Sequence, residues 1–152
     1  MPKVPSALPD HLGYWLRKLS HAVSTSFAER LAARGVSVAQ WVVLRVLFDG
    51  GSFPLKDIVA RVEVDQGALS RMVDRLVARG WVRRVADAGD RRAVAISLTP
   101  AGRRLVPVLA AEADKNEEVF FSAITPSERR EFLRTMQRLL VLNKSDGRSP
   151  VA

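Results

Sequence analysis

Arginine side chains are concentrated between positions 71 and 92 of the chain. This stretch holds seven arginines against three aspartates, and arginine supplies 19 of the 24 basic residues in the whole sequence. A guanidinium group can donate paired hydrogen bonds to a phosphate or to the major-groove edge of guanine. The cluster therefore favours nucleic acid as the partner, against the alternative that the arginine content only reflects genome composition.

Residues 66–77 carry the side chains best suited to reading base edges. One face of the predicted helix is apolar, with Leu69, Met72, Val73, Leu76 and Val77. The opposite face supplies the residues that we predict to contact DNA, namely Gln66, Gly67, Ser70, Arg71 and Arg75. Glutamine can pair with adenine and arginine with guanine, while a small residue lets the helix approach the duplex closely. The simpler alternative is a solvated face on which Asp74 pairs with Arg71 or Arg75.

A second group of charges lies in the polar segment 86–92, between two apolar segments of strand type at 81–85 and 93–98. This pattern, with Gly89 in the polar segment, predicts a β-hairpin with a charged tip. An arginine on a projecting hairpin suits the narrow minor groove, where negative potential is concentrated. We expect Asp90 to hold the guanidinium of Arg92, with Arg91 and Arg84 nearer the phosphates.

The elements that must position these residues can be predicted from periodicity and capping signals. The first ten residues contain three prolines and are expected to form a flexible arm. Four helices should follow, at 11–34, 38–49, 55–62 and 66–79, then the two strands, then helices starting at 100 and 126. The order α-α-α-α-β-β-α-α is mainly α with an α+β wing. It predicts a winged helix-turn-helix with flanking N- and C-terminal dimerisation helices.

The chain is expected to be a single subunit, 1–152, with the winged helix-turn-helix DNA-binding region at 37–99. The helices at 11–34 and 100–143 carry more apolar surface than so small a motif can cover. We therefore expect these helices to pair with those of a second copy and form a homodimer. A protein that binds a twofold-symmetric DNA site needs two DNA-binding motifs about 34 Å apart along the duplex. The alternative is that these helices pack back on their own chain.

Composition excludes several classes of protein. The formal net charge is +8, of which +4 lies within residues 55–103, and the chain contains no cysteine. Without cysteine there is no disulfide, thiolate zinc site or thiol switch. No apolar run approaches the ~20 residues of a membrane span, and no signal peptide is recognisable, so a cytoplasmic protein is expected. No nucleophile elbow, phosphate-binding loop or paired-histidine motif occurs, and we expect no enzyme activity, metal or cofactor.

At residues 66–102 the sequence resembles the MarR (multiple antibiotic resistance regulator) family. The segment from Asp90 to Gly102, DRRAVAISLTPAG, is similar to the wing signature of that family. The segment 66–76, QGALSRMVDRL, is similar to its recognition helix, and Gly80-Trp81-Val82 followed by Arg84 matches the start of its wing. The resemblance extends at the level of pattern over residues 11–142. Val85-Ala86 depart from the more polar residues often found there.

This resemblance implies a homodimeric transcriptional regulator that binds a roughly palindromic operator in double-stranded DNA. Many members of the family repress transcription until a small aromatic or lipophilic acid, or an oxidant, releases them. The absence of cysteine excludes sensing by thiol oxidation, which leaves a small-molecule ligand as the expected signal. The alternative function is a low-specificity architectural DNA-binding protein without an effector.

The resemblance also implies a ligand pocket where the first, second and fifth helices meet the winged region. The candidates there combine aromatic rings with cations, which would suit an aromatic carboxylate. They are His11, Tyr14, Trp15, Arg17, His21, Trp41 and Arg45. The alternative is that Trp15 and Trp41 belong to the core. The two histidines lie ten residues apart without nearby cysteine or clustered carboxylates, so they do not predict a metal site.

Overall fold

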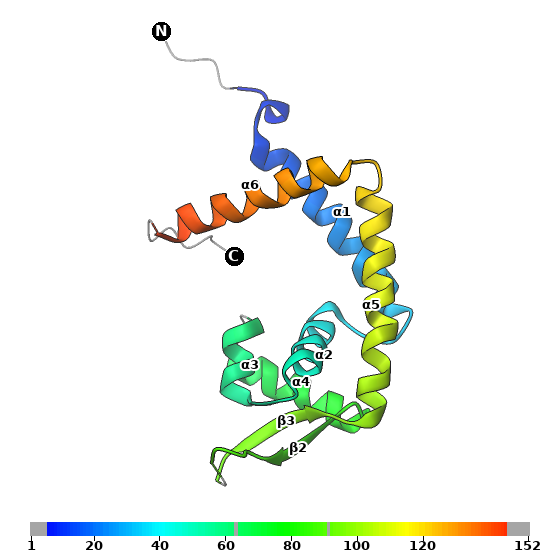
Figure 1. The fold of residues 1–152 in the computed structure, drawn as a ribbon, viewed down its shortest axis with the longest axis vertical. Helices are drawn as coiled ribbons and strands as arrows, with labels where there is room; N and C mark the ends of the chain where they lie inside the picture. The colour runs from blue at the N-terminus through cyan, green and yellow to red at the C-terminus, as the bar shows by residue number, and fades with distance from the viewer. Residues whose placement is uncertain (1–5, 63, 91, 146–152) are drawn as a thin grey trace. The chain divides into compact units, whose positions relative to one another are not determined.

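The computed structural model describes residues 6–145 except positions 63 and 91, and describes side chains as far as Asn143. The chain divides into two compact units, residues 1–116 and 117–152. Its elements are a 3-10 helix η1 (Leu8–Asp10), α1 (Leu12–Ala32), α2 (Val38–Gly50), β1 (Ser52–Pro54), α3 (Leu55–Val62), α4 (Gln66–Ala78), β2 (Val82–Ala86), β3 (Val94–Leu98), α5 (Pro100–Phe121) and α6 (Pro126–Ser145) (Figure 1). The mainly helical winged fold expected from the sequence is confirmed.

Residues 6–10, the described part of the expected flexible arm, contain an ordered turn. Within the described part of this segment, residues 8–10 form η1, and the Asp10 carboxylate accepts the backbone N–H of Ala7 at 3.1 Å. The indole of Trp15 donates to the carbonyl of Pro9 at 2.9 Å. Trp15 is 53% exposed, so its assignment to the core was wrong. The proline-rich composition concealed a short turn that the indole holds against α1.

Helix starts follow the capping residues visible in the sequence. The Ser37 hydroxyl accepts the backbone N–H of Gln40 at 3.1 Å, while the Gln40 side chain accepts the N–H of Ser37 at 3.0 Å. The carboxylate of Asp65 accepts the N–H of Ala68 at 2.8 Å and begins α4. These side chains satisfy backbone donors that the first helical turn leaves unpaired. The boundaries of α2 and α4 are therefore fixed by local chemistry.

The sheet has three strands, in the order β1-β3-β2, with both pairs antiparallel. The expected hairpin is confirmed, and β2 and β3 extend beyond the neighbouring helices (Figure 1). The expectation of two strands was wrong, because Ser52–Pro54 forms β1 and pairs with β3. A strand of three residues that ends in proline is too short to show a two-residue alternation.

One hydrophobic core joins the helices of the first unit to the sheet. Its completely buried members include Leu31 of α1, Leu44 of α2, Ile58 of α3, Leu76 of α4 and Leu109 of α5. Half-buried Trp41 packs edge-on against Phe27, with ring centroids 6.3 Å apart, so it packs against the core and is not, as the sequence had suggested, one of its buried members. Because α5 supplies core residues, its first half is part of the same folded body as α4.

A buried carboxylate ties α5 to the end of α1. Glu112 lies 2.8 Å from Arg34, 3.2 Å from Lys115 and 3.8 Å from Arg30, and only 9% of its side chain is exposed. The hydrogen bond from Arg34, followed by that from Lys115, lowers the pKa of Glu112 below its ordinary value of 4.5. One turn further along α5, the Asn116 amide donates to the carbonyl of Val23 at 3.2 Å.

The Glu112 cluster predicts a specific dependence of stability on pH. A lowered pKa in the folded state means that the carboxylate contributes stability above pH 4.5 and loses it as the pH falls through the folded-state pKa. Glu112→Gln should therefore lower the free energy of unfolding at pH 7, and this deficit should shrink at pH 3. Urea unfolding at both pH values measures it. Glu118→Gln, an exposed change on the same helix, is the control and should show no such deficit.

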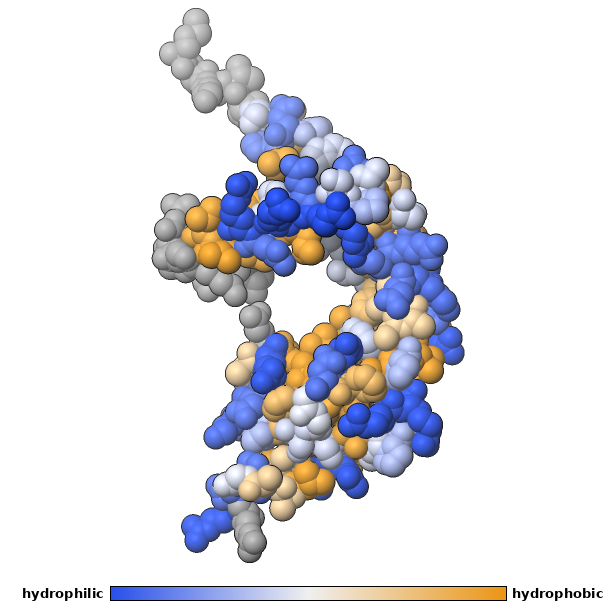
Figure 2. Space-filling view, viewed as in Figure 1, coloured by the Kyte–Doolittle hydropathy of each residue, from blue (hydrophilic) through white to orange (hydrophobic). Residues whose placement is uncertain are grey.

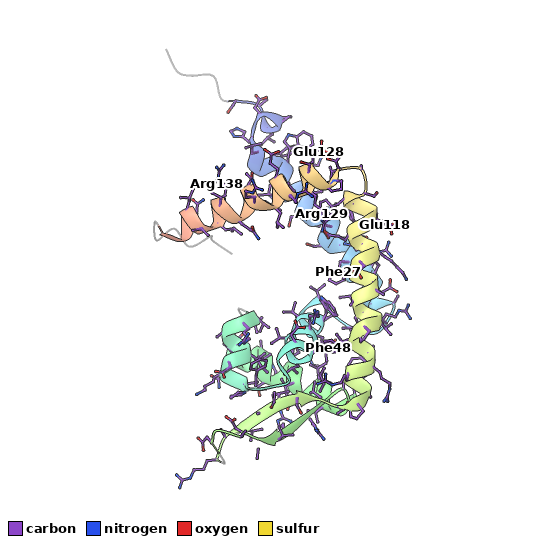
Figure 3. All side chains as sticks on the ribbon, in the orientation of Figure 1. Phe27, Phe48, Glu118, Glu128, Arg129 and Arg138 are labelled. Carbon is purple, nitrogen blue, oxygen red and sulfur yellow. The ribbon has the colours of Figure 1, made fainter. Side chains whose placement is uncertain are left out.

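The second unit consists of the end of α5 and α6. Arg129 forms an ion pair with Glu117 at 2.7 Å, and Glu128 accepts the N–H and hydroxyl of Thr125 in the predicted capping box (Figure 3). The far end of α6 exposes a run of apolar side chains, visible as a hydrophobic patch in Figure 2: Leu139, Leu140, Val141 and Leu142. A patch of this kind is typical of a surface that another chain covers.

Candidate nucleic-acid interface

Helix α4 presents its polar face to solvent. Leu69, Val73 and Leu76 are completely buried, which anchors the helix to the core along one side. On the other side Gln66, Gly67, Arg71 and Arg75 are exposed and Ser70 is half-buried. All five residues predicted to contact DNA on this helix therefore share one accessible face or its border.

The N-terminal turn of α4 is open because position 67 has no side chain. A Cβ added to Gly67 would lie 3.2 Å from the Asp65 carboxylate and 3.6 Å from a guanidinium nitrogen of Arg71. The Arg71 side chain therefore lies beside Gly67, at the positive end of the helix. Backbone N–H groups and a guanidinium at one point form a natural contact for a phosphate or a base edge.

An ion pair joins α4 to the wing. Asp74 accepts a hydrogen bond from Arg84 of β2, rather than pairing with Arg71 or Arg75 as the solvated-face alternative supposed. Within the part of the chain that the structure describes, Arg71 and Arg75 have no ion-pair partner. The guanidinium groups of Arg71 and Arg75 on the exposed face of α4 are thus available to pair with an anion on another molecule.

The wing loop is held by two aspartates that bind backbone, not side chain. Asp87 accepts the N–H of Gly89 at 3.1 Å, and Asp90 accepts the N–H of Arg92 at 2.9 Å. The expectation that Asp90 holds the guanidinium of Arg92 was wrong. The predicted contact Arg91 lies outside the described residues. A short loop favours the nearest backbone donor, and this leaves the exposed Arg92 side chain without an ion pair among the described residues.

Arg79, which the sequence did not single out, braces the other end of α4. Its guanidinium lies 3.9 Å from the centroid of the Trp81 ring and donates to the carbonyl of Gly35, in the turn between α1 and α2. Gly35 has φ +70, and a Cβ there would lie 2.9 Å from a nitrogen of Arg79. The contact spans 44 positions of sequence, so no local pattern could have indicated it.

Replacing Arg79 should measurably lower the stability of the folded protein. Arg79→Leu loses the cation–π contact with Trp81 and the hydrogen bond to Gly35, and should lower the free energy of unfolding by about 1 kcal/mol. Urea denaturation measures the change. Arg104→Leu, at an exposed arginine that makes no side-chain hydrogen bond, ion pair or cation–π contact within the described residues, should leave stability nearly unaltered. Equal effects of the two substitutions would contradict the assigned role of Arg79.

The candidate ligand residues separate into two groups. Tyr14, Arg17 and His21 line one shallow groove along α1, together with Lys18, Ser20 and Ser24. The other candidates have different surroundings. The ring of His11 lies 2.9 Å from the Ser6 hydroxyl, Trp15 binds Pro9, Trp41 packs on Phe27, and Arg45 pairs with Asp49. Lys18, which the sequence did not indicate, stands 5.3 Å from the Tyr14 ring centroid.

Comparison with known proteins identifies relatives that share the sequence pattern and the fold of this chain. A model of the MarR family matches residues 36–94, from the start of α2 to the start of β3. A crystal structure of a MarR-family transcriptional regulator from Silicibacter pomeroyi is 30% identical. The match covers 88% of this chain and 90% of that one, with a TM-score of 0.72. The chain belongs to the MarR family. The resemblance seen at residues 66–102 is thereby confirmed.

Two further known proteins are similar to this chain over different lengths. The structure of Bordetella bronchiseptica BpsR, which concerns regulation of its DNA binding by 6-hydroxynicotinic acid, is 29% identical with a TM-score of 0.78. That match covers 90% of this chain and 97% of BpsR. The transcriptional regulator TtmR of Methylorubrum extorquens is 35% identical over 66% of this chain, which spans about half (52%) of that relative's length. Among the described residues of this MarR-family regulator, no helix has the length and apolar character needed to cross a membrane.

Proposed function

We propose that this MarR-family regulator is a sequence-specific repressor that binds a pseudo-palindromic operator in double-stranded DNA as a homodimer. The observation that carries the proposal is the exposed face of α4. Arg71 and Arg75 stand there without an ion pair within the described residues, and Gly67 opens the helix N-terminus. The Asp74–Arg84 ion pair joins this face to the wing, so that α4 and the hairpin can engage neighbouring grooves together.

Homodimer formation is supported by apolar side chains that each unit leaves in solvent. On α1, Leu12 is 87% exposed and Leu16 is 55% exposed, beside the exposed ring of Trp15. On α6, the run from Leu139 to Leu142 is at least half exposed throughout. Burying side chains of this size contributes about 1.5–3 kcal/mol each. The segments 11–34 and 100–143 are therefore proposed to pair with a second copy.

The effector is proposed to be a small aromatic or lipophilic acid. The α1 groove offers the Tyr14 ring beside the cations of Arg17 and Lys18, which can stack on an aromatic ring and pair with a carboxylate. The relative BpsR responds to an acid of this class. Because the chain has no cysteine, thiol oxidation is not available as the signal.

Competition binding tests the proposed reading of an operator. Duplexes selected by the protein from genomic fragments would compete with scrambled duplexes of equal length at several salt concentrations. A specific reader should keep a preference of about 1,000-fold or more at physiological salt. Equal affinities, weakening together as salt rises, would instead favour low-specificity architectural binding.

The oligomeric state tests the proposed dimer. Light scattering after gel filtration should give twice the chain mass of 16.8 kDa for the parent protein. Leu12→Glu combined with Leu16→Glu should give monomers, because two carboxylates would have to be buried without partners. Thr25→Glu, at an exposed polar position on the opposite face of the same helix, is the matched control and should remain dimeric. A monomeric parent protein would refute the proposal.

A further inference from the structure

A row of hydrogen-bonding side chains crosses the face of the sheet that lies opposite α4. The register places Ser52 of β1 beside Ser97 of β3, and Ser97 beside Arg83 of β2. Neighbouring residues of a strand point to opposite faces. Arg84 turns toward Asp74 of α4, so Arg83 points to the other side, where its Nε lies 3.4 Å from the Ser97 hydroxyl.

The first turn of α5 closes one end of this row. Thr99, Pro100 and Arg103 line a groove of about 540 Å³ together with Ser52, Arg83 and Ser97. The N-terminus of a helix carries partial positive charge, and α5 is 22 residues long. The hydroxyl of Thr99 is already used, since it donates to the Gly80 carbonyl at 2.6 Å and accepts the N–H of Gly102.

The charges of the groove are positive and uncompensated. No carboxylate is among the described residues that line it, and neither Arg83 nor Arg103 forms an ion pair within the described ranges. The guanidinium of Arg103 makes a cation–π contact with Phe48 of α2, at 5.6 Å from the ring centroid. Two guanidinium groups beside two serine hydroxyls form a donor set matched to the oxygens of a phosphate.

We propose that this groove, here called the sheet groove (Ser52, Arg83, Ser97 and Arg103), binds the phosphate group of an anionic ligand. Phosphate is favoured over a single carboxylate because the donors come from β1, β2, β3 and α5, which surround the groove. Arg83 and Arg103 each offer a bidentate edge, and a tetrahedral dianion can accept from several directions. The sheet groove is separate from the α1 groove and from the exposed face of α4, so it adds a site to the proposed function.

The test uses the full-length protein without DNA. Inorganic pyrophosphate would be titrated by calorimetry, and binding should be saturable. Arg83→Gln and Arg103→Gln should each weaken binding at least fivefold, and the double variant should abolish it. Arg104→Gln removes the same charge from the next residue of α5, outside the described lining, and should stay within twofold of the parent protein. Circular dichroism would confirm that each variant is folded.

Absence of saturable binding, or equal weakening by Arg104→Gln, would overturn the proposal. Because this experiment contains no DNA, its outcome is independent of whether an operator is read. A second titration, on protein saturated with its selected duplex, identifies the source of the phosphate. Continued pyrophosphate binding assigns the sheet groove to a free phosphate ester. Loss of binding, with a salt slope of duplex binding reduced by about one in Arg83→Gln, assigns it to a DNA phosphate.

Discussion

Gly102→Ala should be among the most destabilising single substitutions in this protein. A Cβ at position 102 would lie 2.0 Å from the carbonyl oxygen of Trp81 and 2.9 Å from its carbonyl carbon. Both neighbours are backbone atoms, so relief requires α5 to move away from the segment that joins α4 to β2. Overpacking of this kind costs about 3 kcal/mol. For a chain of this size that corresponds to a fall in Tm of roughly 6–12 °C.

Thermal unfolding followed by circular dichroism would measure this effect, with Gly13→Ala as the matched control. Gly13 lies in α1, and a Cβ there would meet no atom within 4 Å. Alanine favours helix over glycine, so the control should be unchanged or slightly more stable. If Gly102→Ala unfolded at the same temperature as the parent protein, the close packing of α5 on Trp81 would be refuted.

The same contact explains part of the signature that pointed to the family. The Thr99 N–H donates to the Trp81 carbonyl at 3.0 Å, and the Thr99 hydroxyl donates to the Gly80 carbonyl. Three positions later Gly102 gives the room that the Trp81 carbonyl needs. The sequence indicated that Leu98-Thr99 and Gly102 belong to a motif. The reason for these residue types is visible only in the fold, where residues about 20 positions apart in the chain come into contact.

Local signals predicted most of the fold. Ser37, Asp65 and Thr125 cap helices because a side chain can satisfy backbone donors two or three residues away. The apolar faces of α2 and α4 are buried because their spacing matches the helical period. β1 was missed because its pairing with β3, whose partner residues lie 41–45 positions later in the chain, sets its conformation more than its own three residues do.

The candidate site was predicted less completely, because its geometry depends on which polar partners compete. From the sequence alone, Asp74 could have paired with any of three arginines. It forms an ion pair with Arg84 because β2 passes beside α4. Asp90 bound the nearer backbone N–H of Arg92. Both outcomes release arginines that a reading of the sequence alone would have paired. Arg79 depends on the distant turn at Gly35 and has no sequence signal.

Arg92→Ala should produce the largest loss of DNA affinity among the wing residues that the structure describes. Its side chain is exposed on the hairpin, and Asp90 binds its backbone N–H, which fixes the loop without neutralising the guanidinium. An arginine in the minor groove is drawn by concentrated negative potential. We expect at least a tenfold weakening of operator binding, about 1.4 kcal/mol, by fluorescence anisotropy at fixed salt.

The dimer should survive this change, because Arg92 lies in the wing and not in the helices proposed to pair. Arg104→Ala removes an equal charge from the exposed surface of α5 and should alter affinity much less. If Arg92→Ala disrupted the dimer, the assignment of the wing to DNA binding and not to dimerisation would be contradicted. Unchanged affinity would show that the hairpin tip does not reach DNA.

Arg71→Ala tests whether Arg71 contacts a base, which contributes to sequence specificity, or a phosphate, which contributes to affinity for any sequence. If Arg71 contacts a base beside Gly67, its removal should cost about 1–3 kcal/mol on the best site and relax preference at one position. If it contacts a phosphate, every sequence should weaken alike and the salt slope should fall by about one. Measuring both quantities on selected and scrambled duplexes separates the two roles.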